Sequence, residues 1–137
     1  MLFHRALPSF HLNLRNSIKK KQKYYFNDLG VRNALLKNFE PLGERRDKGA
    51  LFENFIFNEM VKQNVYQRGF KDFFYYRNYE KAEIDFVLQK DGKLELFETK
   101  FSSDKKHIKT ALGMANVVTY ENCRDLIMKQ YKLEANE

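Results

Sequence analysis

Two strand-like segments carry the residues of this sequence that are best placed to do chemistry. Residues 82–89 and 94–101 are both rich in apolar residues, and the segment 90–93, Lys-Asp-Gly-Lys, separates them. An Asp-Gly pair between two such segments predicts a β-hairpin with a two-residue turn. Counting outward from that turn places Asp85 opposite Glu98, so that both carboxylates lie on one face of the sheet.

Two carboxylates in these positions repel each other unless a positive charge compensates. Directly opposed residues have Cβ atoms about 4.5–5.5 Å apart, and like charges at this distance destabilise a sheet. Mg²⁺ is commonly held by one or two carboxylates with water and substrate phosphate, so we predict that Asp85 and Glu98 bind Mg²⁺ or Mn²⁺. Lys100 lies on the same face, where its ammonium could orient a water or offset phosphate charge. This combination suits metal-assisted phosphodiester hydrolysis.

The same residues also admit a purely structural interpretation. A bulge or a different turn would shift the register, and Asp85, Glu98 and Lys100 would then form an ordinary ion-pair network. Arg77 has two interpretations as well. It is a candidate phosphate contact, or it pairs with Glu80 or Glu83, and we prefer the pairing.

The segment from Gly49 to about residue 63 is the clearest helix of the sequence. Its apolar residues, among them Phe52, Ile56 and Met60, recur at helical spacing. Glu53 interrupts this pattern on an apolar flank of the helix, instead of facing water. We therefore predict that Glu53 adds a further carboxylate to the site.

The remaining pattern mixes short strands and helices. Strands are expected at residues 24–26, 73–76 and 117–120, and helices at about 28–37, with Asp28 in the N-cap region, at 102–112, and in a last segment that carries Cys123, Leu126, Ile127 and Tyr131 on one stripe. With 137 residues, 13 Phe and 8 Tyr, the chain has the material for one packed domain. We predict a single α/β domain over residues 24–137, with a mixed sheet flanked by helices.

The N-terminal segment 1–23 looks like a basic arm or a truncated element. Its candidate nucleic-acid contacts are Lys19, Lys20, Lys21 and Lys23, although such a run is often only solvated. The net charge of +7 and pI near 9.4 favour a polyanionic partner such as DNA.

Cysteine and histidine usage excludes several classes of protein. Cys123 is the only cysteine, so no internal disulfide can form, and no His/Cys grouping has zinc spacing. No segment has the length and apolar character of a signal peptide or a membrane span. We expect a cytoplasmic protein with no membrane association.

Five blocks of the sequence form an ordered series, at residues 23–33, 49–54, 75–77, 83–88 and 98–100. This series resembles the nuclease-like C-terminal domain of prokaryotic AAA-type ATPases, domain-of-unknown-function family 4143, in the PD-(D/E)XK nuclease superfamily. The resemblance runs from about residue 10 to about residue 103. It implies a restriction-endonuclease-like core and a catalytic set carried by Glu53, Asp85, Glu98 and Lys100.

Two features depart from the family pattern. Ile84-Asp85 stands where Pro-Asp is usual, which leaves the carboxylate in place. Members normally carry an ATPase module ahead of this domain, so we expect this chain to be a fragment or a shortened product with the ATPase as a separate partner. The resemblance implies a Mg²⁺-dependent nuclease-like domain that acts on DNA. The alternative is a non-catalytic DNA-binding or docking module that regulates an ATPase partner.

Overall fold

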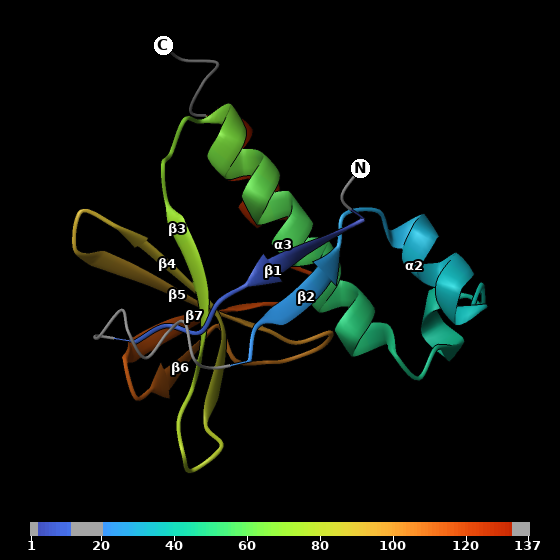
Figure 1. The fold of residues 1–137 in the computed structure, drawn as a ribbon, viewed down its shortest axis with the longest axis horizontal. Helices are drawn as coiled ribbons and strands as arrows, with labels where there is room; N and C mark the ends of the chain where they lie inside the picture. Colours follow the sequence, from blue (N-terminus) through green and yellow to red (C-terminus); the bar gives the residue numbers. More distant parts are fainter. Residues whose placement is uncertain (1–2, 12–20, 133–137) are drawn as a thin grey trace.

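The fold is built on a five-stranded sheet with strand order β3-β4-β5-β7-β6 (Figure 1). The computed structural model describes residues 3–11 and 21–132. The strands are β3 (Asp72–Arg77), β4 (Glu83–Lys90), β5 (Lys93–Thr99), β6 (His107–Thr110) and β7 (Gly113–Val118). Neighbours are antiparallel except β5 and β7, which run parallel. The predicted α/β class with a mixed sheet is confirmed.

The β4–β5 hairpin has the turn and the register that its sequence predicts. Asp91 and Gly92 have φ angles of 51° and 74°, and a two-residue turn that follows the twist of its strands requires positive φ at both positions. The ladder runs from Lys90 with Lys93 to Phe86 with Phe97. Asp85 and Glu98 come next along the two strands, at the point where this ladder ends.

The helices are α2 (Leu29–Leu36), the short 3-10 helix η1 (Leu42–Glu44), α3 (Lys48–Tyr66) and α4 (Cys123–Lys132). Asp28 is the N-cap of α2, where its side chain accepts a hydrogen bond from the backbone N–H of Val31 at 3.1 Å. In Figure 1, α3 crosses behind the β1 and β2 strands, and α2 lies away from the five-stranded sheet. None of the helices in the described part of the chain is long and apolar enough to cross a membrane.

Helix α3 covers one face of the sheet with the apolar residues that predicted it. Ile56 and Phe57 are 2% and 3% exposed, and Phe86 of β4 is fully buried against this layer. The rings of Phe57 and Phe86 are stacked with centroids 5.9 Å apart. Burying side chains of this size contributes about 1.5–3 kcal/mol each. This packing fixes the position of α3, and with it Glu53, relative to the hairpin.

The helix predicted at residues 102–112 is wrong, because this part of the chain contains β6 and the start of a second hairpin. Ile108 and Leu112 fit helical spacing, but Ile108 and Thr110 also alternate with exposed neighbours, as in a strand. The Thr110 hydroxyl donates to the carbonyl of Gly113 at 2.6 Å, and Gly113 has a φ of 133°. The following strand therefore starts at Gly113 and ends at Val118, earlier at both ends than predicted.

Part of the predicted N-terminal arm belongs to the folded structure. Strand β1 (His4–Leu7) pairs antiparallel with β2 (Lys23–Phe26), and Leu7 is completely buried in the main core. The chain then joins the edge of β3, where the N–H of Phe10 donates to the carbonyl of Tyr75 at 2.6 Å. Of the predicted basic run, Lys19 and Lys20 lie outside the described residues.

Candidate functional site

Asp85 lies near the start of β4, with only 9% of its surface exposed. Its Oδ2 atom accepts hydrogen bonds from the backbone N–H of Thr99 at 2.7 Å and from the Thr99 hydroxyl at 2.9 Å. The described β4–β5 ladder ends at the pair Phe86 and Phe97, so the backbone N–H of Thr99 lies beyond it. The Asp85 carboxylate accepts the hydrogen bond of this N–H in place of a ladder partner. This arrangement fixes the orientation of Asp85.

Glu98 lies beside Asp85, as the hairpin register predicted. Burial, the Asp85 charge and a hydrogen bond to Asp85 together raise the pKa of Glu98 to about 8, although Lys100 opposes the shift. Glu98 therefore keeps its proton at neutral pH. Lys100 is exposed, and its backbone N–H donates to the carbonyl of Val118 at 2.9 Å.

Glu53 approaches the same place from α3. Burial and then the charge of Asp85 raise the pKa of Glu53, while Lys23 and a hydrogen bond from Tyr25 partly offset them. The structure thus brings Glu53, Asp85 and Glu98 from three different elements into one electrostatically coupled group. We call these three residues, with Glu83, the carboxylate site.

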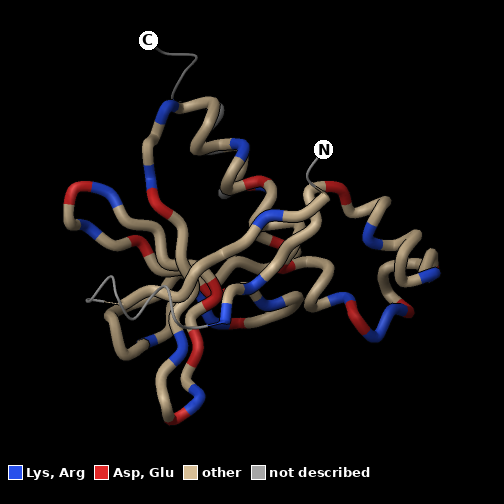
Figure 2. Tube along the Cα trace, in the orientation of Figure 1, with Lys and Arg blue, Asp and Glu red and all other residues tan. Residues whose placement is uncertain are grey.

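Lys23 has a different environment from the one expected of a phosphate contact on a mobile arm. Its Nζ atom lies 3.4 Å from Oε1 of Glu53, contacts Oε1 of Glu83, and sits 5.3 Å from the centre of the Tyr75 ring. Burial alone would lower the pKa of Lys23, but the charges of Glu53 and Glu83 outweigh it and the pKa is raised. In Figure 2, acidic and basic positions lie close together where β2 passes the start of β4.

Tyr25 was missed as a site residue by reasoning from residue types. Its hydroxyl donates to Oε1 of Glu53, and only 5% of the residue is exposed. Burial, followed by the charge of Glu53 and the hydrogen bond to it, raises the pKa of Tyr25. The available signal was the spacing of Lys23 and Tyr25, which places both side chains on one face of a strand.

The other predicted nucleic-acid contacts have separate positions. Arg77 lies at the end of β3, where its Nη2 atom is 3.1 Å from Oε2 of Glu83, so the preferred ion pair is present. The backbone carbonyl of Lys21 accepts a hydrogen bond from the Tyr75 hydroxyl. Lys and Arg positions are distributed over the traced chain in Figure 2 and do not gather in one region.

The donor set for a metal ion is small. Across residues 3–11 and 21–132, no three side chains of His, Cys, Asp or Glu are arranged to hold a metal ion together. The Asp85–Glu98 pair offers two carboxylate groups. Two carboxylates are sufficient for an ion that keeps its waters and is completed by substrate phosphate.

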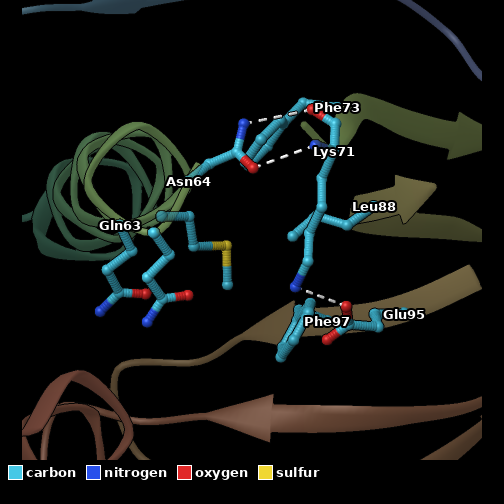
Figure 3. Close-up of a pocket in the computed structure, with 9 residues that line it drawn as sticks. Gln63, Asn64, Lys71, Phe73, Leu88, Glu95 and Phe97 are labelled. Atoms are coloured by element: carbon cyan, nitrogen blue, oxygen red, sulfur yellow. Dashed lines mark hydrogen bonds and ion pairs between the residues drawn. The ribbon is translucent and has the colours of Figure 1, made fainter. Parts of the chain in front are cut away.

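A hollow lies between α3 and the turn end of the hairpin (Figure 3). It is lined by Gln63 and Asn64 of α3 and by Phe97, and the Lys71 ammonium lies 2.7 Å from Oε1 of Glu95 at its rim. The Nε2 atom of Gln63 is buried there without a hydrogen-bond partner among the described atoms. This hollow shares no lining residue with the carboxylate site.

Comparison with known proteins identifies a family. The model of a domain of unknown function, DUF4143, matches residues 48–130, which is more than half of the chain. The match includes Glu53, Asp85, Glu98 and Lys100, and it continues well beyond residue 103, where the recognisable resemblance ended. Neither the curated proteins nor the solved structures contain a match. On the strength of the family match, the chain belongs to the DUF4143 family.

Proposed function

We propose that this domain is a Mg²⁺- or Mn²⁺-dependent phosphodiesterase of the nuclease type, acting on DNA. The observation that carries the proposal is the position of Asp85 and Glu98 at the end of the β4–β5 ladder, where Thr99 holds the Asp85 carboxylate through two hydrogen bonds. Burial, followed by the charge of Asp85, raises the pKa of Glu98 to about 8. Strongly shifted groups with a specific charged neighbour are typical of functional sites.

A divalent cation suits this donor set. Asp85 and Glu98 present carboxylate oxygens from adjacent strands, and Thr99 holds Asp85 in place through two hydrogen bonds. Mg²⁺ favours such oxygen ligands, and when bound it would polarise a phosphoryl oxygen and lower the pKa of a coordinated water. Binding requires that Glu98 lose its proton, which couples metal affinity to pH.

The side chains around the pair have separate roles in the proposed hydrolysis. Lys100 orients the attacking water and offsets the charge that develops on the phosphate. The water oxygen bonds to phosphorus and one phosphorus–oxygen ester bond breaks; the water proton passes to a carboxylate, and the leaving oxygen gains a proton from solvent. Glu53 adds negative charge that attracts the cation. We propose that the basic residues, including Lys21, hold the DNA backbone.

The test is a parallel measurement of metal binding and cleavage. Mn²⁺ is titrated into the parent, Asp85→Asn and Glu98→Gln proteins, and each is then incubated with plasmid and single-stranded DNA. Glu95→Gln is the matched control, because it makes the same change on the same strand, β5, outside the carboxylate site. We expect Mn²⁺-dependent cleavage by the parent and control only. A parent that binds Mn²⁺ and leaves both DNAs intact contradicts the proposal.

One observation favours a second candidate, a non-catalytic DNA-binding or docking module that regulates an ATPase. No three metal-binding side chains converge in the described part of the chain, so the carboxylates would then act only as ion-pair partners. This candidate predicts salt-dependent DNA binding, or binding to an ATPase, that Asp85→Asn and Glu98→Gln leave unchanged. Metal-dependent binding that both variants abolish would exclude it.

A further inference from the structure

We propose that the Lys23 ammonium is a built-in cation of the carboxylate site, held between Glu53 and Glu83 in a position that would otherwise take a divalent ion. The site then needs one exchangeable metal ion, at Asp85 and Glu98, and the protein supplies the second positive charge. This inference builds on the proposed function and assigns Lys23 a positioning role in it.

The contacts of Lys23 show that its position is built by the fold. The Nζ atom lies 3.4 Å from Oε1 of Glu53 on α3 and contacts Oε1 of Glu83 on β4. The ring of Tyr75 lies 5.3 Å from the same nitrogen, which adds a cation–π attraction. Three elements therefore converge on one ammonium group whose side chain is 28% exposed.

Both carboxylates are also held from a second direction. The buried Tyr25 hydroxyl donates to Glu53, and Arg77 pairs with the other oxygen of Glu83, Oε2, at 3.1 Å. Because these contacts do not involve Lys23, we expect the two carboxylates to keep their orientation when the ammonium is removed. They then converge on the vacated position, which is the arrangement that binds a small cation.

The charge of Lys23 is stable in this environment. Burial opposes the charge of Lys23, but Glu53, Glu83 and Asp85 outweigh burial and raise the pKa, so Lys23 is cationic at neutral pH. A fixed cation beside the Asp85–Glu98 pair lets the site neutralise a substrate phosphate with one exchangeable ion. A two-metal site would use a second ion for this purpose.

The number of bound ions tests the assignment. Mn²⁺ binding is counted by electron paramagnetic resonance for the parent, Lys23→Ser, Lys23→Met and Lys23→Arg proteins, with circular dichroism to confirm folding. Lys23→Met keeps the aliphatic stem next to Tyr75 if the serine variant does not fold. We expect each folded variant without the charge to bind one Mn²⁺ more than the parent, and Lys23→Arg to bind the parental number. Equal counts in the parent and the uncharged variants overturn the inference.

The same experiment separates this inference from the proposed function. A parent that binds no ion while Lys23→Ser binds one contradicts the metal site at Asp85 and Glu98 but supports the role of Lys23. If the parent and Lys23→Ser each bind one ion, the metal site at Asp85 and Glu98 is supported and the role of Lys23 is contradicted. Adding Glu83→Gln to Lys23→Ser should remove only the extra ion, whereas adding Glu98→Gln should remove only the original one.

Discussion

Replacing Glu98 with glutamine should stabilise the metal-free protein at alkaline pH and have little effect in mild acid. The pKa of Glu98 rises from 4.5 to about 8 in the folded state, with burial and the neighbouring Asp85 as its main causes. Between these two values the folded protein keeps a proton that the unfolded chain has lost, so its stability falls as pH rises. Glutamine does not ionise, and its amide can still donate to Asp85. The variant should therefore escape this loss.

The magnitude follows from the size of the shift. At about 1.4 kcal/mol per pKa unit, the full shift sets an upper limit of ~5 kcal/mol. Glu98 is partly exposed, and solvent screens part of the repulsion. We therefore expect the free energy of unfolding of Glu98→Gln to exceed that of the parent by about 2 kcal/mol at about pH 9. The difference should be nearly gone at about pH 5.

Urea denaturation at a series of pH values, in the presence of a chelator, measures this difference. Glu95→Gln serves as the control, because Glu95 lies on the same strand and is 48% exposed in its side chain. Its effect should be small at every pH. A Glu98→Gln protein that is no more stable than the parent at about pH 9 would refute the electrostatic coupling of Asp85 and Glu98. Saturating Mn²⁺ should reverse the order at that pH, because only the parent gains binding energy.

Four further substitutions test other parts of the structure. Leu7→Ala should cost about 3 kcal/mol in urea denaturation, because Leu7 is fully buried; a negligible cost would mean that β1 lies outside the core. Hydrogen bonds and charge from Arg45 and Arg32 hold the pKa of Asp47 below its usual range. The ionised Asp47 therefore stabilises the fold above about pH 4, and this stabilisation is lost as pH falls further. Asp47→Asn should remove that acid-dependent loss from thermal melts, and an unchanged pH profile would contradict the pairing. Gly92→Val should destabilise by about 1–2 kcal/mol, because Gly92 has a φ of 74°, whereas wild-type stability would argue against the turn. Gln63→Met should stabilise the protein by about 1 kcal/mol, because it removes a buried amide nitrogen without a described partner. If calorimetry shows that the variant is instead less stable by a similar amount, a bound water satisfies this nitrogen in the parent.

Local chemistry determined much of the fold in advance. The Asp-Gly turn specified the hairpin and its register, because positive φ at two consecutive positions leaves few other turns available. The apolar spacing of α3 likewise predicted both the helix and the unusual position of Glu53. Asp85 and Glu98 could be placed together from the sequence, since the turn alone relates them.

Weak local patterns were resolved only by strand pairing and core packing. Residues 102–112 carry two apolar residues at a spacing that suits a helix, yet they form β6 and a turn because β7 provides the partner strand. Leu7 and Phe10 looked like part of an arm, but Leu7 is buried in the core cluster that includes α3, and Phe10 is buried in a second cluster of sheet residues. Secondary structure in such segments depends on tertiary contacts more than on intrinsic propensity.

The partners of Lys23 could not be read from the sequence at all. Glu53 lies 30 residues away and Glu83 lies still further along the chain, and nothing local relates their side chains to β2. The structure brings them together because α3 packs on the sheet while β2 passes the start of β4. The sequence by itself determined the Asp85–Glu98 pair, since a single turn aligns it. Only the tertiary structure decided that Lys23 lies between Glu53 and Glu83, because β2, α3 and β4 must come together to place these three side chains.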